Sequence, residues 1–389
     1  MVLELIVSIL TYLVLAVFLS ISSINLITAF MSLKQQEYLE FFFPTVSVVV
    51  RTWNDGSVVE RCIQNFLKQN YPKKEFEIII VDDGSKDNTK EICEKYARDG
   101  KIKYVRLPEH HEFKSEVIDH AIGKFSTGDI ILETDVDFVL PNDWIKEMVK
   151  PFSNEQVMGV TGRVMCGNWY ENWLTHIRAI EDFWYFCITM FGRYKFTGQG
   201  TLYGSSKAYR KSFWKEIGGH PKVIVEDAGL FAEIIARGHK IVNVKVTNLA
   251  EEVNTLKQYF AERKRWAGGN IEVFSRYGKT FRTKLLFYIV LLSNFSIDGI
   301  LLLSFILMFF QQLFFIPIFM HMIAIWIGLW GVKAQDHFYL WSVVYISIGP
   351  ILQILAVLAA FKDKITKGTL VWEKVWHHPT LLNWPTKFK

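Results

Sequence analysis

Residues 129–137, "DIILETDVD", indicate the fold expected for this chain. An aliphatic run, 130–132, leads into an acidic cluster in which Asp135 and Asp137 are separated by one residue. Short aliphatic runs of this kind are typical of strands that are buried on both faces of a sheet. The stretch therefore predicts a buried strand that carries two carboxylates at its carboxyl end.

Three similar runs precede this stretch, and helical patterns separate them. The runs are "TVSVVV" (45–50), "FEIIIV" (76–81) and "IKYVRL" (102–107). Helices are expected near 58–67, after the acidic turn up to about residue 98, and near 114–124. Alternating strands and helices predict an α/β fold with a mostly parallel, Rossmann-like sheet and right-handed crossovers. Ligands of such sheets bind beyond the carboxyl ends of the strands. The polar clusters 52–55, 82–85 and 135–137 are therefore expected to line one crevice.

The acidic pair at the end of the 130–134 run suits a divalent cation. Mg²⁺ and Mn²⁺ take oxygen ligands and are often held by one or two carboxylates together with substrate phosphates. We therefore expect Asp135 and Asp137 to hold Mg²⁺ or Mn²⁺ in company with a diphosphate. The alternative is a solvated acidic turn without a ligand.

Two further acidic pairs have both a structural and a chemical interpretation. Asp82 and Asp83 precede a glycine after the second run, where they could cap a helix or accept hydrogen bonds from a nucleobase or ribose. Glu226 and Asp227 open an amphipathic helix, where acids favour the helix dipole. A carboxylate at that position is also a candidate general base for an acceptor hydroxyl.

The stretch "YFAERKRWAGG" (259–269) places three functional side chain types on one helical face. Glu262, Arg265 and Trp266 follow i, i+3 and i+4 spacing. The planar guanidinium of Arg265 suits a diphosphate, and Trp266 can stack on a sugar. The alternative is a basic helix that is seated on anionic headgroups beside the membrane.

The composition indicates a membrane protein with a globular centre. Half of the 389 residues are hydrophobic, and residues 5–31 form an uncharged run too long for a signal peptide. We expect an N-terminal transmembrane helix (1–33), a globular domain (44–282), about three transmembrane helices (283–361) and a basic, interfacial tail (362–389). A net charge of +5 without a basic stripe argues against nucleic acid, and the four scattered cysteines are expected to be free thiols.

The distribution of charge near the helices predicts the orientation. Lys34 follows the first helix and only Glu4 precedes it, so the N-terminus is expected outside and the central domain in the cytoplasm, at the plasma membrane. Three later crossings would leave the tail outside, although Lys362, Lys364 and Lys367 favour the inside. The alternative is that one C-terminal segment lies in the interface instead of crossing.

Residues 168–196 and Asp298 leave further alternatives open. Aromatic and aliphatic residues recur at helical spacing from Trp169 to Ile188, which predicts either a helix of the domain core or a helix in the membrane interface. Asp298 lies within an apolar stretch, where it is either a functional acid or a residue at a helix end or facing the bundle.

Together these motifs resemble the family 2 inverting glycosyltransferases with a GT-A fold, and within them the membrane-integrated synthases related to hyaluronan, chitin and cellulose synthases. The resemblance covers about residues 44–270 and the flanking helices. It is carried by "VVVRTWND" (48–55), "IVDDGS" (80–85), residues 113–137, "GQGTLYGSSKAYRKSFWKEIGG" (198–219), "VED" (225–227) and "ERKRW" (262–266).

The resemblance implies a role for each matching residue. Asp227 would be the catalytic base, and Arg265 would grip the diphosphate. The other implied contacts are those of the donor (Thr52, Trp53, Asp82, Asp83, Lys114, Asp135), the metal (Asp135, Asp137) and the acceptor (Glu262, Trp266).

Three residues depart from the pattern of that family. Glu262 replaces the usual glutamine, which puts processive synthesis of long chains in doubt. Arg51 and Asp119 stand where proline and asparagine are usual, and neither change removes a group that the chemistry needs.

The resemblance implies a nucleotide-sugar donor, UDP-linked, and a saccharide or lipid-linked acceptor, with membrane lipids as further partners and no nucleic acid. Two alternatives remain. One is a transferase that loads a monosaccharide onto a polyprenyl phosphate, and the other is a non-catalytic membrane sensor of nucleotide sugars.

Overall fold

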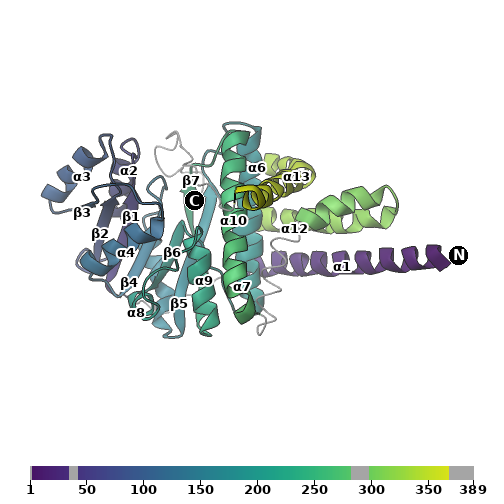
Figure 1. Cartoon of the computed structure of the whole chain (residues 1–389), viewed down its shortest axis with the longest axis horizontal. Coiled ribbons are helices and arrows are strands. Elements are labelled where there is room, and N and C mark those ends of the chain that lie inside the picture. Colours follow the sequence, from purple (N-terminus) through teal and green to yellow (C-terminus); the bar gives the residue numbers. More distant parts are fainter. Residues whose placement is uncertain (1, 35–42, 282–297, 368–389) are drawn as a thin grey trace.

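The computed structural model describes residues 2–34, 43–281 and 298–367. One sheet of seven strands lies at the centre of the globular part, in the order β3-β2-β1-β4-β6-β5-β7 (Figure 1). The strands are β1 (Val46–Thr52), β2 (Phe76–Asp82), β3 (Lys103–Arg106), β4 (Ile130–Thr134), β5 (Val157–Cys166), β6 (Ser206–Arg210) and β7 (Lys240–Ala250).

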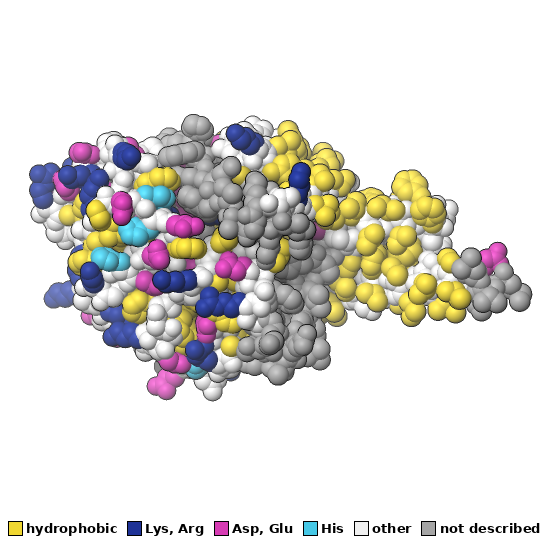
Figure 2. Space-filling view, in the orientation of Figure 1, with side chains coloured by type: hydrophobic (Ala, Val, Ile, Leu, Met, Phe, Trp, Pro, Cys, Tyr) yellow, Lys and Arg dark blue, Asp and Glu magenta, His cyan; other side chains and the backbone are white. Residues whose placement is uncertain are grey.

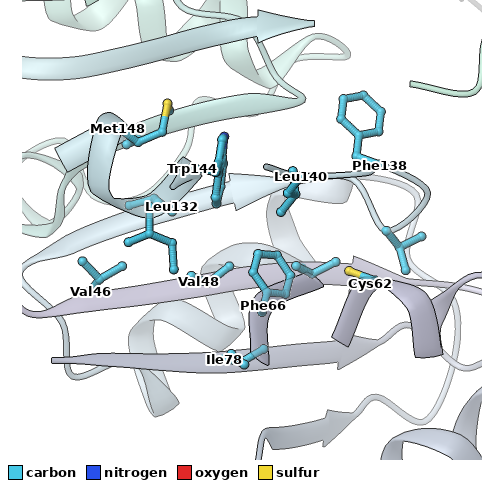
Figure 3. Close-up of a cluster of buried hydrophobic side chains, with 14 of the residues drawn as sticks. Val46, Val48, Cys62, Phe66, Ile78, Leu132, Phe138, Leu140, Trp144 and Met148 are labelled. Atoms are coloured by element: carbon cyan, nitrogen blue, oxygen red, sulfur yellow. The ribbon is translucent and has the colours of Figure 1, made fainter. Parts of the chain in front are cut away.

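The first four strands are parallel, as the alternation of strands and helices predicts. They alternate with α2 (Val59–Leu67), α3 (Thr89–Arg98) and α4 (Lys114–Phe125). Successive side chains of a strand point to opposite faces, and both faces of this half are covered. Val48 packs with Phe66 and Trp144 on one face (Figure 3), whereas Val49 packs with the apolar side chains of α4 on the other.

The second half of the sheet is mixed. Strand β6 is antiparallel to both β4 and β5, and β5 and β7 are parallel to each other. Thr134, at the carboxyl end of β4, pairs with Ser206 at the start of β6. The segment before β6 therefore lies at the same end of the sheet as the acidic residues that follow β4.

Further helices complete the domain, and α6, α7 and α10 lie on the side that faces the apolar helices (Figure 1). After α5 (Trp144–Val149) and a 3-10 turn (Lys150–Ser153), α6 (Trp173–Asp182) continues through a π-helical segment (Phe183–Met190) into α7 (Phe191–Thr197). The remaining domain helices are α8 (Lys211–Glu216), α9 (Glu226–Ala236) and α10 (Leu256–Phe281). In Figure 1, α10 and the α6–α7 rod stand between the sheet and the helices that project from the domain.

Residues 173–197 are helical, and most of their side chains are buried. Ile177, Ile180, Trp184 and Ile188 pack with side chains of the apolar helices, including Ala29 and Ile325. This segment is thus a core element at the junction between the domain and the apolar helices. Its π-helical part does not follow from the spacing in the sequence.

Within the described residues, three helices are long and apolar enough to cross a membrane: Ile6–Ser32, Gln312–Gly331 and Asp336–Ala360. They belong to α1 (Val2–Ser32), to a 3-10 turn (Gln312–Phe314) with α12 (Phe315–Gly331), and to α13 (Asp336–Lys367). A shorter apolar helix spans Asp298–Met308. On the face shown in Figure 2, hydrophobic side chains dominate the projecting part, whereas most charged side chains lie over the domain, among hydrophobic and other ones.

Helices α1 and α12 extend from the domain along the long axis, whereas α13 runs across that direction beside α10 and α6 (Figure 1). The contact to α6 includes a hydrogen bond from Gln353 to Glu181. Parts of two predictions, the helix expected from residue 283 and the tail after residue 367, lie outside the described residues. Residues 362–367 continue α13.

Candidate active site

Asp135 lies directly after β4 and is held from two sides. Its Oδ1 accepts from Lys114 Nζ at 2.5 Å, and its Oδ2 accepts from Ser205 Oγ at 2.8 Å. Burial raises the pKa of Asp135, but the charge of Lys114 outweighs it and lowers the pKa to about 2. The carboxylate is therefore ionised at neutral pH, with a cation of the protein beside it.

Asp227 lies at the same site because β6 returns along β4. Its Oδ2 accepts from the backbone N–H of Gly204 at 2.7 Å, and Gly204 is adjacent to Ser205. Burial and the neighbouring charge of Glu226 raise the pKa of Asp227. A raised pKa makes a carboxylate a better proton acceptor, so the environment of Asp227 suits a general base.

A network of buried charges surrounds Lys207, whose positive charge acts on Asp227. Lys207 is fully buried and lies 3.1 Å from Glu133 and 3.3 Å from Glu226. Glu133 also pairs with His220, 3.1 Å away. Each charge in the network has a partner of opposite sign, which is the condition under which buried ions are tolerated.

Asp119 orients this network from α4. It accepts from the backbone N–H of His220 and from its Nδ1 at 2.6 Å, and from Trp214 Nε1 at 2.6 Å. Although burial opposes a charge on His220, Glu133 and Asp119 raise its pKa to about 9. Asp119, which replaces the usual asparagine of the resembling family, thus has a structural function here.

Asp82 and Asp83 follow β2 and have different surroundings. Asp82 is fully buried and accepts from Ser85 N, Tyr104 Oη and Arg106 Nη1 at 2.6–2.8 Å. These hydrogen bonds fix the turn that follows β2. Asp83 is also buried, but its partners include groups that reach the surface of the site, which makes it the better candidate for a base contact.

Asp83 accepts from Arg51 Nη2 at 2.5 Å, from His110 Nδ1 at 2.8 Å and from His111 Nδ1 at 2.8 Å. Burial opposes the charge of Asp83, but the hydrogen bonds from Arg51 and His111 outweigh it, so the pKa is lowered. The His110 ring also stacks on Trp53.

The turn that carries Trp53 is fixed by hydrogen bonds to the turn after β2. Asp55 accepts from Thr52 Oγ1 and from Trp53 N, while Asn54 N donates to Ser85 Oγ at 2.8 Å. Asn54 has a φ of 54°, a left-handed conformation that asparagine tolerates better than most residues. Thr52 and Trp53 therefore lie beside Asp83, where the nucleobase of the donor is predicted to bind.

Helix α10, which carries Arg265 and Trp266, packs against the segments that flank Gly204 and Asp227. Trp266 lies edge-on to Tyr203, with ring centroids 6.3 Å apart, and a Cβ at Gly269 would lie 2.0 Å from Val225 Cγ2. Tyr203 is adjacent to Gly204, and Val225 is two residues before Asp227. Arg265 Nε is buried and has no hydrogen-bond partner among the described residues, as expected of a group that awaits an anionic ligand.

Glu262 points into an ion cluster between α6 and α10. Arg178 is 1% exposed and pairs with Glu252, with Glu181 at 2.6 Å and with Glu262 at 3.9 Å. Arg263 joins the same cluster through Glu181, at 2.6 Å. This position gives Glu262 a function in packing α10 against α6, and its contact with an acceptor stays a prediction.

The residues at the end of β4 fit a hard divalent cation. Carboxylate oxygens are suitable donors, and Asp137 follows Asp135 by two residues. No group of three or more His, Cys, Asp or Glu side chains suited to a metal occurs within the described ranges. An ion held by Asp135 and Asp137 would therefore need further oxygen ligands, such as those of a diphosphate.

Several residues of the site do not follow from the sequence patterns. Gly204 and Ser205 hold Asp227 and Asp135, His110 and His111 hold Asp83, and Lys207 neutralises Glu226. The glycine-rich stretch before β6 was the only local signal for the first pair. The four cysteines, by contrast, are buried free thiols as expected.

A mostly parallel, Rossmann-like sheet with a mixed second half and helices on both faces is the architecture of the GT-A glycosyltransferases. Residues 47–218 match the family described as glycosyl transferase family 2. This segment is therefore similar to a glycosyltransferase family 2 domain, and the match supports the predicted fold and enzyme class.

Curated relatives agree with this class. The chain is 26% identical over 256 residues to "Probable glycosyltransferase YdaM" of Bacillus subtilis, covering 63% of this chain and 60% of the relative. It is 27% identical over 238 residues to an N-acetylglucosaminyltransferase of Rhizobium meliloti, covering 58% and 55%. It is 26% identical over 248 residues to a beta-monoglucosyldiacylglycerol synthase of Trichormus variabilis, covering 62% and 52%. The chain thus spans between half and three-fifths of the length of these relatives.

A solved structure shares the fold over nearly the whole chain. It is the mannosyltransferase PcManGT from Pyrobaculum calidifontis in complex with GDP-Man and Mn²⁺, with a TM-score of 0.60 and 17% identity. The match covers 92% of this chain and 98% of that chain. At this level of identity the likeness concerns the fold.

Proposed function

We propose that this protein is a membrane-bound inverting glycosyltransferase that moves a sugar from a nucleoside diphosphate to a hydroxyl of a saccharide or lipid-linked acceptor. The observation that carries the proposal is the joint anchoring of Asp227 and Asp135 by Gly204 and Ser205. It supports a site in which a base for the acceptor lies next to the carboxylate for the donor.

In the proposed reaction, Asp227 accepts the proton of the acceptor hydroxyl. The hydroxyl oxygen bonds to the anomeric carbon as the bond from that carbon to the diphosphate oxygen breaks, so the configuration inverts. Lys114 and Arg265 stabilise the charge that develops on the leaving diphosphate. Mg²⁺ or Mn²⁺, when held by Asp135 and Asp137, would add positive charge at the same oxygens. The raised pKa of Asp227 supports its function as the proton acceptor.

For the donor side we propose Thr52, Trp53 and Asp83 as the groups near the nucleoside, with Asp82 as a support of the turn. For the acceptor side we propose Trp266, which lies against Tyr203 beside Gly204. The relatives include a beta-monoglucosyldiacylglycerol synthase, whose name supports a lipid acceptor.

We further propose that the domain faces the cytoplasm at the plasma membrane and that α13 does not cross the bilayer. Its direction across α1 and α12 supports this proposal (Figure 1). Exposed apolar side chains recur along one side of α13 at Leu340, Val343, Ile351, Leu355 and Leu358, as expected of a helix that meets lipid laterally. With α13 in the interface, the tail lies on the side of the domain, where Lys362 is favoured.

The test is a screen of UDP- and GDP-sugars with membranes that contain the full chain and Mn²⁺. Release of nucleoside diphosphate from one donor class, together with a neutral glycolipid, oligosaccharide or polymer, would support the proposal. A charged monosaccharide-phosphate lipid as the product would favour the polyprenyl-phosphate alternative. No release from any donor would favour a sensor.

A further inference from the structure

The ring of His110 makes the two contacts that a nucleobase would be expected to make at this site. It stacks on Trp53 with ring centroids 3.8 Å apart and an interplanar angle of 11°. Its Nδ1 lies 2.8 Å from Asp83 Oδ2, at hydrogen-bond distance. A planar ring that stacks on an aromatic side chain and donates an N–H to a carboxylate has the same contact chemistry as a base.

The carboxylate of Asp83 is saturated by the protein. Oδ2 accepts from Arg51 Nε and Nη2 at 3.1 and 2.5 Å and from His110, while Oδ1 accepts from His111 N and Nδ1 at 3.1 and 2.8 Å. Five donors thus share a carboxylate that offers about four lone-pair positions. Asp83 can accept a further N–H only if one of these donors leaves.

His110 is the donor best suited to leave. Its side chain is 30% exposed and belongs to a connection between β3 and α4, whereas Arg51 is part of β1 and only 13% exposed. His111 is attached to Asp83 through its backbone as well as through its ring. When His110 leaves, it frees a lone pair of Asp83 and the face of Trp53 together.

We propose that His110 occupies the nucleobase position and that the donor nucleotide binds by displacing it from Trp53 and Asp83. This inference rests on the proposed function and adds a residue that determines the affinity and base specificity of the donor site. His110 is a positioning residue in this proposal, because it competes with the base and takes no part in transfer.

The contact with Asp83 also selects among bases. Uracil presents N3–H and guanine presents N1–H at the edge that would replace the His110 N–H. Adenine and cytosine present a ring nitrogen acceptor there, whose lone pair would face the carboxylate. Because unpaired buried polar groups are costly, we expect uridine and guanosine diphosphates to bind at least about tenfold more tightly than those of adenosine and cytidine.

The test is calorimetric titration of UDP, with Mn²⁺ present, into the full-length protein in detergent. His110→Ala removes the competitor, so the dissociation constant for UDP should fall on the order of tenfold. Trp53→Ala removes the stacking surface and should weaken UDP binding. His120→Ala, a matched change on α4 that removes none of the hydrogen bonds to Asp83, should leave the dissociation constant unchanged.

Weaker or unchanged UDP binding in the His110→Ala protein would overturn the inference, because a competitor must raise affinity when it is removed. If the wild-type protein nevertheless releases UDP from a UDP-sugar, the inference about His110 fails and the proposed function is retained. If the wild-type protein binds neither UDP nor GDP, the proposed function fails as well.

Discussion

Asp227 and Asp135 are held by two adjacent residues: Gly204 donates its N–H to Asp227 at 2.7 Å, and Ser205 donates its hydroxyl to Asp135 at 2.8 Å. The two carboxylates are 92 positions apart in the chain. Their common anchor lies directly before β6, whose antiparallel pairing with β4 places it at the end of that strand. The relative position of base and donor carboxylate thus depends on one short segment.

Replacement of Asp227 by asparagine should abolish transfer without abolishing donor binding. The amide keeps the size of the side chain but cannot accept the acceptor proton, and general base catalysis typically contributes about 10²–10⁴-fold. Turnover and donor affinity of the variant, measured side by side, check this. Turnover at the wild-type rate would remove Asp227 from the function of base.

The variant Asp135→Asn should weaken metal-dependent donor binding. It removes the charge that Lys114 and a divalent ion share, whereas Ser205→Ala removes only one neutral hydrogen bond to the same carboxylate. We therefore expect a large rise in the donor dissociation constant with Mn²⁺ for Asp135→Asn and a smaller rise for Ser205→Ala. Equal donor binding by wild type and Asp135→Asn would contradict a metal ligand at this position.

Glu226→Gln should shift the acid side of the pH profile for transfer. The charge of Glu226 raises the pKa of Asp227, so its removal lowers that pKa. Asp227 must be ionised to accept a proton, and activity on the acid side therefore extends to lower pH in the variant. The profile of kcat/KM against pH for both proteins measures the shift, and a shift to higher pH would refute the coupling.

Arg265→Ala should lower turnover by about 10²–10³-fold, the typical effect of losing one group that stabilises transition-state charge. Arg265→Lys should recover only part of this loss, because an ammonium lacks the planar fork that binds a diphosphate. Lys257 is an exposed residue at the start of α10, and the control variant Lys257→Ala should turn over at the wild-type rate. A full rate in Arg265→Ala would place the diphosphate elsewhere.

The proposed orientation can be tested by labelling single cysteines, since the four native cysteines are buried. A membrane-impermeant maleimide should label Glu4→Cys in intact cells, and should label Lys101→Cys and Thr366→Cys only after permeabilisation. Thr366 lies near the end of α13 and reports the side of the tail. Labelling of Thr366→Cys in intact cells would show that α13 crosses the membrane.

The strands of the parallel half could be predicted closely from the sequence. The runs 45–50 and 76–81 correspond to Val46–Thr52 and Phe76–Asp82. This agreement arises because local signals suffice: aliphatic runs buried on both faces, each ended by a polar turn. The π-helical segment Phe183–Met190 has no such signal, since it shares its apolar spacing with an ordinary helix.

The candidate active site also combines features that have a local signal in the sequence with features that have none. The residue types and positions of Asp83, Asp135 and Asp227 were sufficient to propose their functions. The partners of these carboxylates were not predictable, because His110, Gly204 and Lys207 carry no motif and reach the site only through the packing of distant segments.

By itself, the sequence determined the class of fold, the apolar helices and the acids at the strand ends, since these depend on local periodicity and on residue chemistry. Only the tertiary structure decided that β6 runs against β4, that α13 lies across α1, and that Asp227 and Asp135 share one anchor. These features arise from contacts between segments far apart in the chain, where the pairing is chosen by the packing of the whole domain and not by any one stretch.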